Sequence, residues 1–171
     1  RQRLAYGMAQ SFSSVLHTLR KEMIRSYKAG SAGRGVLDQL VAEHPEFTDS
    51  YLVLGLFEYH VGILPEETKW KTKLLGLEGN AQLGISYLER AIESAPATGP
   101  EAARVLLMDL QLPEEEQCRY RSLARLMRDT YPSNKLFPVY ARVYDMQCRI
   151  AELEGRAIAA DMPINLSSGC R

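Results

Sequence analysis

The sequence predicts an all-α fold, a chain of about eight helices joined by short connections. Apolar residues recur at every third or fourth position along most of the 171 residues, which is the period of helices that bury one face. Runs in which apolar and polar residues alternate, the pattern of strands, are absent, and β-branched residues fall at helical spacing. A chain of this length can bury one core, and short connections favour antiparallel packing of neighbouring helices.

The first expected helix follows a stripe of apolar side chains over residues 4–27. The stretch "GSAGRG", residues 30–35, lacks the Lys-Ser/Thr pair of a phosphate-binding loop, so we interpret it as a linker that ends this helix. A second, shorter helix carries apolar residues from 36 to 41. It stops before Pro45, because the residue before a proline disfavours helical backbone.

The third expected helix is the apolar run "YLVLGLFEYHVGILP", residues 51–65, and a polar residue among 48–50 can cap its start. The run is shorter than the roughly 20 residues that cross a bilayer, and Glu58 and His60 lie near its middle. We therefore expect a helix packed between other helices, and no membrane-spanning segment.

Residues 65–80 predict a short helix of a different kind, which begins after Pro65 and carries the single tryptophan, Trp70. We expect Trp70 to be largely buried. Two interpretations of this insert stay open: it covers a gap in the core, or it caps a groove and shapes a ligand site. Further helices are expected over residues 81–94, 101–112, 113–130 and 136–160, followed by a flexible tail, residues 161–171.

Composition argues against several partners. Lys plus Arg equals Asp plus Glu, 21 each, so the formal net charge is zero, and neither nucleic acid nor an anionic membrane surface is an expected partner. Cys118, Cys148 and Cys170 are widely spaced and do not form a metal-binding pattern. We expect Cys118 and Cys148 to be core thiols, although an odd number of cysteines leaves disulfide bonds open.

The sequence offers no recognisable catalytic or cofactor site. Glu58 and His60 are two positions apart on a helix, so their side chains diverge and cannot share a metal. His17 and His44 have no Asp, Cys or His three or four residues later, and no Gly-x-Ser-x-Gly motif is present. We expect a protein that is not an enzyme and needs neither a metal nor a cofactor.

Regularly placed prolines and small residues suggest a repeat. Pro96 and Pro132 are about one 34-residue unit apart, and Pro45 precedes Pro96 by about half a unit more, an excess that matches the insert 65–80. Gly84, Leu88 and Ala91 before Pro96, and Tyr51-x-x-Leu54-Gly55 after Pro45, resemble the tetratricopeptide repeat family. The combination "LGLFEYHVGILP…LLGLEGN…GISYLERA" further resembles a divergent group of bacterial and mitochondria-associated members of this family, in which a short insert interrupts one repeat.

The resemblance implies a right-handed superhelix (α-solenoid) of antiparallel helix hairpins, forming a single domain over residues 1–160. Small residues at repeat positions predict close contacts of Gly55 with Ala91 and of Ala103 with Ala124. By the same resemblance, the protein is a non-catalytic scaffold that binds a protein or peptide partner in a concave groove. The positions of this sequence that match the groove of the family are Leu52, Leu56, Tyr59, His60, Arg142 and Asp145.

Two other functions stay open: a carrier of small molecules or lipids with a pocket under the Trp70 insert, and a helical enzyme with dispersed catalytic residues. A cavity large enough for a ligand would favour the carrier. A homo-oligomer is also compatible with the sequence. The chain begins with Arg1 rather than Met, so we expect a preceding segment; if that segment is a signal peptide, we expect a soluble protein of the bacterial periplasm.

Overall fold

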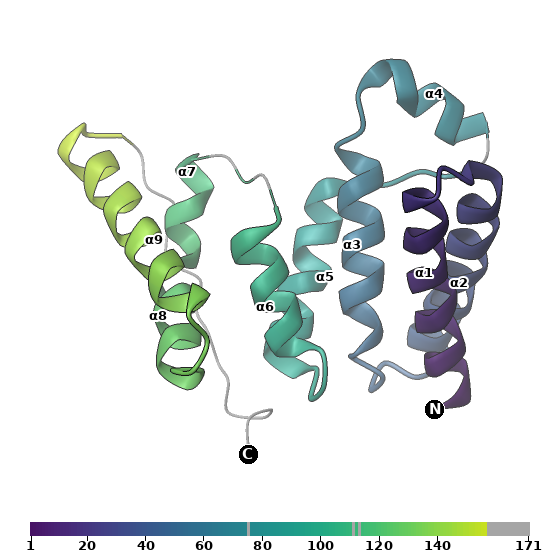
Figure 1. Cartoon of the computed structure of the whole chain (residues 1–171), viewed down its shortest axis with the longest axis horizontal. Helices are drawn as coiled ribbons and strands as arrows, with labels where there is room; N and C mark the ends of the chain where they lie inside the picture. Colours follow the sequence, from purple (N-terminus) through teal and green to yellow (C-terminus); the bar gives the residue numbers. More distant parts are fainter. Residues whose placement is uncertain (75, 111, 113, 157–171) are drawn as a thin grey trace. The chain divides into compact units, whose positions relative to one another are not determined.

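The computed structural model describes residues 1–74, 76–110, 112 and 114–156, and this part of the chain contains helices and no strand (Figure 1). The predicted all-α class is confirmed. None of the described helices combines the length and the apolar character that a bilayer crossing requires. The chain divides into two compact units: the N-terminal unit, residues 1–99, and the C-terminal unit, which begins at Pro100.

The N-terminal unit consists of two helix hairpins and a short helix between the arms of the second one. Its helices are α1 (Gln2–Leu19), α2 (Met23–Glu43), α3 (Ser50–Gly62), α4 (Glu66–Leu74) and α5 (Ala81–Ser94). Helix α1 pairs with α2, and α3 pairs with α5, whereas α4 lies at one end of the unit (Figure 1).

The first hairpin corrects two predictions. The expected single helix over residues 4–27 is broken at residues 20–22, where Lys21 adopts a positive φ of 60°. The glycine-rich stretch 30–35, expected to be a linker, lies inside α2. Its glycines let the two backbones approach: a Cβ atom on Gly33 would lie 2.8 Å from the carbonyl oxygen of Gly7 on α1. Gly30 and Gly33 are therefore packing positions, whereas Gly35 has no neighbouring atom within 4 Å of its Cβ position.

The second hairpin is equally close. A Cβ atom on Gly84 of α5 would lie 2.5 Å from the backbone nitrogen of Tyr59, and one on Gly55 of α3 would lie 2.9 Å from Leu88. Gly55 thus packs against Gly84 and Leu88 of α5, the helix that also carries the predicted Ala91. At the other end, the Asp49 carboxylate accepts hydrogen bonds from the backbone nitrogens of residues 97 and 98, at 3.0 and 2.8 Å.

The insert does not bury its tryptophan. Trp70 is 57% exposed and Leu74 is more exposed still, so the prediction of a largely buried Trp70 is wrong. On the helix α4, Thr68, Lys69 and Thr72 form the more covered face, and Trp70 and Leu74 point to the opposite side. The short apolar stripe in the sequence was therefore not the packed face of this helix.

The C-terminal unit contains α6 (Gly99–Met108, whose first residue is the unit boundary), α7 (Glu114–Gln117), the 3₁₀ turn η1 (Cys118–Tyr120), α8 (Arg121–Thr130) and α9 (Leu136–Leu153). The expected helix over residues 113–130 is thus divided by η1. Ala103 and Ala124, whose contact was predicted, are both buried. The end of the expected last helix beyond residue 156 and the expected tail, residues 161–171, lie outside the described residues.

A disulfide joins Cys118 of η1 to Cys148 of α9, with their Cα atoms 5.3 Å apart. Both cysteines are buried, as predicted, but the prediction that they are free thiols is wrong. Tyr144 of α9 donates a hydrogen bond of 3.1 Å to the carbonyl oxygen of Leu107 on α6. Helix α9 is therefore tied to η1 covalently and to α6 through its buried face. Cys170 lies outside the described residues.

Candidate functional site

The N-terminal unit contains a cavity of about 530 Å³ that is partly open to solvent. Helices α1, α2 and α3 form its walls, and the segment that follows α3 contributes Leu64, Thr72 and Leu77. Most of the lining is apolar. The lining includes Phe12, Val15, Met23, Tyr27, Val53, Leu56, Phe57, His60 and Val61.

The wall from α1 has a simple origin in the sequence. The helix carries small residues on one face, and Gly7, Ser11 and Ser14 of this face pack against α2. Its large apolar residues lie on the neighbouring face, where Phe12 and Val15 line the cavity and remain more than half exposed. The tight hairpin thus keeps Phe12 and Val15 of α1 outside the contact with α2.

Hydroxyl groups on the floor of the cavity bond to one another. Ser14 Oγ on α1 donates to the carbonyl oxygen of Ser26 on α2 at 2.9 Å, and Thr18 Oγ1 lies 2.7 Å from Ser26 Oγ. Thr18 Oγ1 also donates to the carbonyl oxygen of Ser14. These groups connect α1 to α2 and are already satisfied as hydrogen-bonding partners.

A buried ion pair supports the opposite wall. Glu58 of α3 is 6% exposed, and its Oε1 lies 2.5 Å from Arg34 Nη2 of α2. Its Oε2 accepts the backbone N–H of Asn80 at 2.9 Å, while Arg34 Nη1 donates to the carbonyl oxygen of Glu78. The Arg34 guanidinium also lies over the ring of Phe57, 4.5 Å from its centroid. Glu58 and Arg34 therefore hold α2, α3 and the start of α5 together.

The Arg34 guanidinium has a second carboxylate neighbour at the edge of this network. Its Nε atom lies 3.3 Å from Asp38 Oδ2, one turn further along α2. Burial raises the pKa of the Asp38 carboxyl above its ordinary value, against the opposing effect of Arg34 and with a contribution from Glu58. The positive charge of Arg34 thus already interacts with two carboxylates of the protein, Glu58 and Asp38.

The predicted groove residues of α3 have different locations. Leu56 and His60 line the cavity, with His60 exposed at its surface. Leu52 and Tyr59 are buried in the unit and do not line the cavity, whereas Val53 and Phe57 do. The face of α3 that lines the cavity is therefore rotated by about one residue from the groove positions that the resemblance implies.

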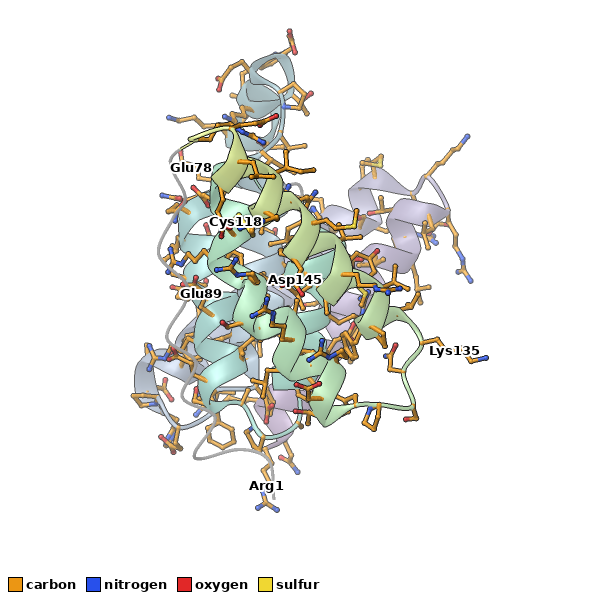
Figure 2. All side chains as sticks on the ribbon, turned by 90° about the vertical axis from the view of Figure 1, so that its left-hand side faces the viewer. Arg1, Glu78, Glu89, Cys118, Lys135 and Asp145 are labelled. Atoms are coloured by element: carbon orange, nitrogen blue, oxygen red, sulfur yellow. A yellow bond between two sulfur atoms is a disulfide. The ribbon has the colours of Figure 1, made fainter. Side chains whose placement is uncertain are left out.

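The other predicted residues, Arg142 and Asp145, belong to α9 of the C-terminal unit and do not line this cavity. Arg142 is exposed. Asp145, labelled in Figure 2, accepts a hydrogen bond of 2.8 Å from Arg125 Nε of α8. Its carboxylate is therefore part of a contact between α8 and α9.

Sequence reasoning missed the lining residues of α1 and α2. The apolar stripe that contains Phe12 and Val15 was recognised, but it was assigned to one long helix with no role at a site. The missing signal was the segregation of small from large residues: Gly7, Ser11 and Ser14 recur at helical spacing beside the apolar stripe.

A second hollow of about 420 Å³ lies along the insert and shares Val61, Thr72 and Leu77 with the cavity. Trp70 lines it together with charged groups. Lys69 Nζ lies 2.7 Å from Glu66, and Lys73 Nζ lies 3.4 Å from Glu78. The insert thus forms one edge of the apolar cavity and one side of a more polar hollow.

Among the described residues, no group of three or more His, Cys, Asp or Glu side chains is arranged to hold a metal ion. Comparisons of the chain with protein-family models, with curated proteins and with solved structures found no match. The geometry of the site alone therefore supports the functional argument.

Proposed function

We propose that the N-terminal unit is a non-catalytic binding module that holds an elongated, mainly apolar ligand in the cavity between α1, α2 and α3. The observation that carries this proposal is the cavity itself. Its volume of about 530 Å³ falls within the roughly 300–1,000 Å³ of small-molecule sites, and its lining is mostly apolar. Of the functions that the sequence left open, this one corresponds to the carrier.

The polar groups of the lining narrow the chemistry of the ligand. The hydroxyl groups of Ser14, Thr18 and Ser26 bond to one another, and Arg34 is paired with Glu58. A ligand with a charged group inside the cavity would lose hydration without gaining a dedicated partner from these residues. An acyl chain or a similar hydrocarbon, with its polar end toward solvent near His60, avoids that cost.

The insert supports the same proposal. Thr72 and Leu77 add to the cavity wall, so the insert shapes the site although it leaves Trp70 exposed. This arrangement favours the second of the two interpretations of residues 65–80, in which the insert caps a groove and shapes a ligand site.

Adjacent residues of α1 provide a matched test. Val15 and Leu16 are both 56% exposed, but only Val15 lines the cavity. We expect Val15→Asp to weaken binding of cis-parinaric acid, a fluorescent fatty acid, by about tenfold or more, since a charge enters the apolar wall. Leu16→Asp should bind like the parent protein. Circular dichroism checks that both variants remain helical, and native mass spectrometry detects any ligand that copurifies.

Two outcomes would overturn the proposal. One is a parent protein that does not increase the fluorescence of the probe at micromolar concentrations. The other is equal binding by folded Val15→Asp and Leu16→Asp, which would place the probe outside the cavity.

A second function, a scaffold for protein interactions, is favoured by a different observation: α9 carries exposed apolar residues, among them Val139, Met146 and Leu153. In this candidate the hairpins stack into the right-handed superhelix that the resemblance to tetratricopeptide repeats implies. The antiparallel pairing of α1 with α2, of α3 with α5 and of α8 with α9 supports the idea. An experimental structure of the whole chain tests it, and hairpins that do not stack in one right-handed array would contradict it.

A further inference from the structure

Helix α9 has two apolar faces. One face packs into the C-terminal unit through Phe137, Ala141, Tyr144, Cys148 and Ala151, all buried. The opposite face is exposed along the whole helix. This second face, which we call the α9 stripe, consists of Leu136, Val139, Val143, Met146, Ile150 and Leu153.

The spacing of the α9 stripe is that of a coiled-coil seam. Its residues alternate at intervals of three and four, so they occupy the a and d positions of a heptad with no interruption. The a positions carry Leu136, Val143 and Ile150, and the d positions carry Val139, Met146 and Leu153. Two of the three a residues are thus β-branched, and two of the three d residues are unbranched at Cβ. β-Branched residues at a with leucine-like residues at d favour two parallel strands.

The charges beside the stripe select the same orientation. The g positions carry Lys135, Arg142 and Arg149, and Glu154 occupies an e position. In an antiparallel pair of α9 helices, the basic g positions of the two copies would lie side by side, and their positive charges would repel each other. A parallel pair instead brings Arg149 close to Glu154 of the second copy. In the single chain, Arg149 pairs with Glu152 and Glu154 pairs with Arg156. Both are exposed ion pairs between residues close in sequence, and such pairs contribute little stability.

We propose that two copies of this chain associate through their α9 stripes as a parallel two-stranded coiled coil. Helix α9 is already folded and held by α6, η1 and the Cys118–Cys148 disulfide, so pairing does not require the helix to form. A single helix stripe is a small interface, and we expect a dimer that dissociates in the micromolar range. The proposal is independent of ligand binding in the N-terminal unit.

Sedimentation equilibrium of the 171-residue protein over a range of concentrations measures the association. Met146→Glu places a charge in the centre of the seam, where the parent side chain is 63% exposed. We expect this change to weaken dimerisation on the order of 100-fold, because each dimer would bury two unpaired charges. Leu74→Glu on α4, at a residue that is 76% exposed, is the matched control and should dimerise like the parent.

A cross-link tests the orientation. In a parallel dimer, residue 136 of one copy lies beside residue 136 of the other; in an antiparallel dimer, the two lie at opposite ends of α9. We therefore expect Leu136→Cys, made in a Cys170→Ser background, to form a covalent dimer under mild oxidation, as seen on non-reducing gels.

The results that overturn the proposal are distinct from those that support it. A parent protein that stays monomeric at several hundred micromolar (well above the expected range), or a folded Met146→Glu variant that dimerises normally, would show that a second copy does not occupy the stripe. A dimer in which Leu136→Cys fails to cross-link would exclude the parallel arrangement.

Discussion

The disulfide between Cys118 and Cys148 makes the stability of the C-terminal unit sensitive to reduction. The bond joins residues that are 30 positions apart, so it restricts the unfolded chain of η1, α8 and α9. The entropy of closing a loop of this length corresponds to about 3–4 kcal/mol of stability. Reduction should therefore lower the free energy of unfolding of this unit by about that amount, which is a large part of the stability of a small domain.

The assay separates the two units. Trp70, the single tryptophan, lies in the N-terminal unit, so its fluorescence follows that unit during unfolding by urea. Amide hydrogen exchange of α9, read by mass spectrometry, follows the C-terminal unit. With a reducing agent such as TCEP, we expect faster exchange in α9 and an unchanged transition of Trp70 fluorescence.

The variant Cys148→Ala should reproduce the effect of TCEP, and TCEP should then have no further effect on α9. Equal exchange of α9 in the oxidised and reduced proteins would refute the reasoning, because the bond would then add no restraint. Thiol alkylation under native, non-reducing conditions is the direct check: labelled Cys118 or Cys148 in the purified protein would show that the bond had not formed.

Other predictions concern single positions. Gly84→Ala should destabilise the N-terminal unit by about 1–3 kcal/mol, because the new Cβ meets the backbone of Tyr59. Gly35→Ala, with open space around its Cβ, should be neutral or stabilising. Unfolding by urea measures the stability of both variants. Burial raises the pKa of Tyr144 to about 12, so the neutral phenol is favoured in the folded state. Stability should therefore fall as the pH rises from about 10 to about 12, and Tyr144→Phe should reduce this fall, as measured by pH-dependent melting.

The helices themselves were predictable because the apolar period is strong throughout the chain. The first hairpin was not, since its turn at residues 20–22 contains neither glycine nor proline, the usual signals of a break. The strongest apparent break, the glycine-rich stretch 30–35, is a helix interior where close packing compensates for the low helix propensity of glycine. Local propensity and tertiary packing favoured different interpretations of the same residues.

The candidate site was predictable only in part. The resemblance predicts groove residues on α3, and two of them, Leu56 and His60, line the cavity. The register was the weak point, because α3 is apolar around most of its circumference, and such a helix gives little indication of which face meets a groove. The prediction therefore named Leu52 and Tyr59, whereas the structure has Val53 and Phe57 in the cavity wall.

The cavity follows from how α1 distributes its side chains. When a helix packs through its large apolar residues, these side chains are buried in the core and cannot line a ligand site. Helix α1 packs against α2 through Gly7, Ser11 and Ser14 instead, so Phe12 and Val15 are left beside the hairpin. Helix α9 shows the same separation, with one apolar face in the core and the α9 stripe outside it. In both helices, we propose a function for the large apolar residues that are not buried in the core.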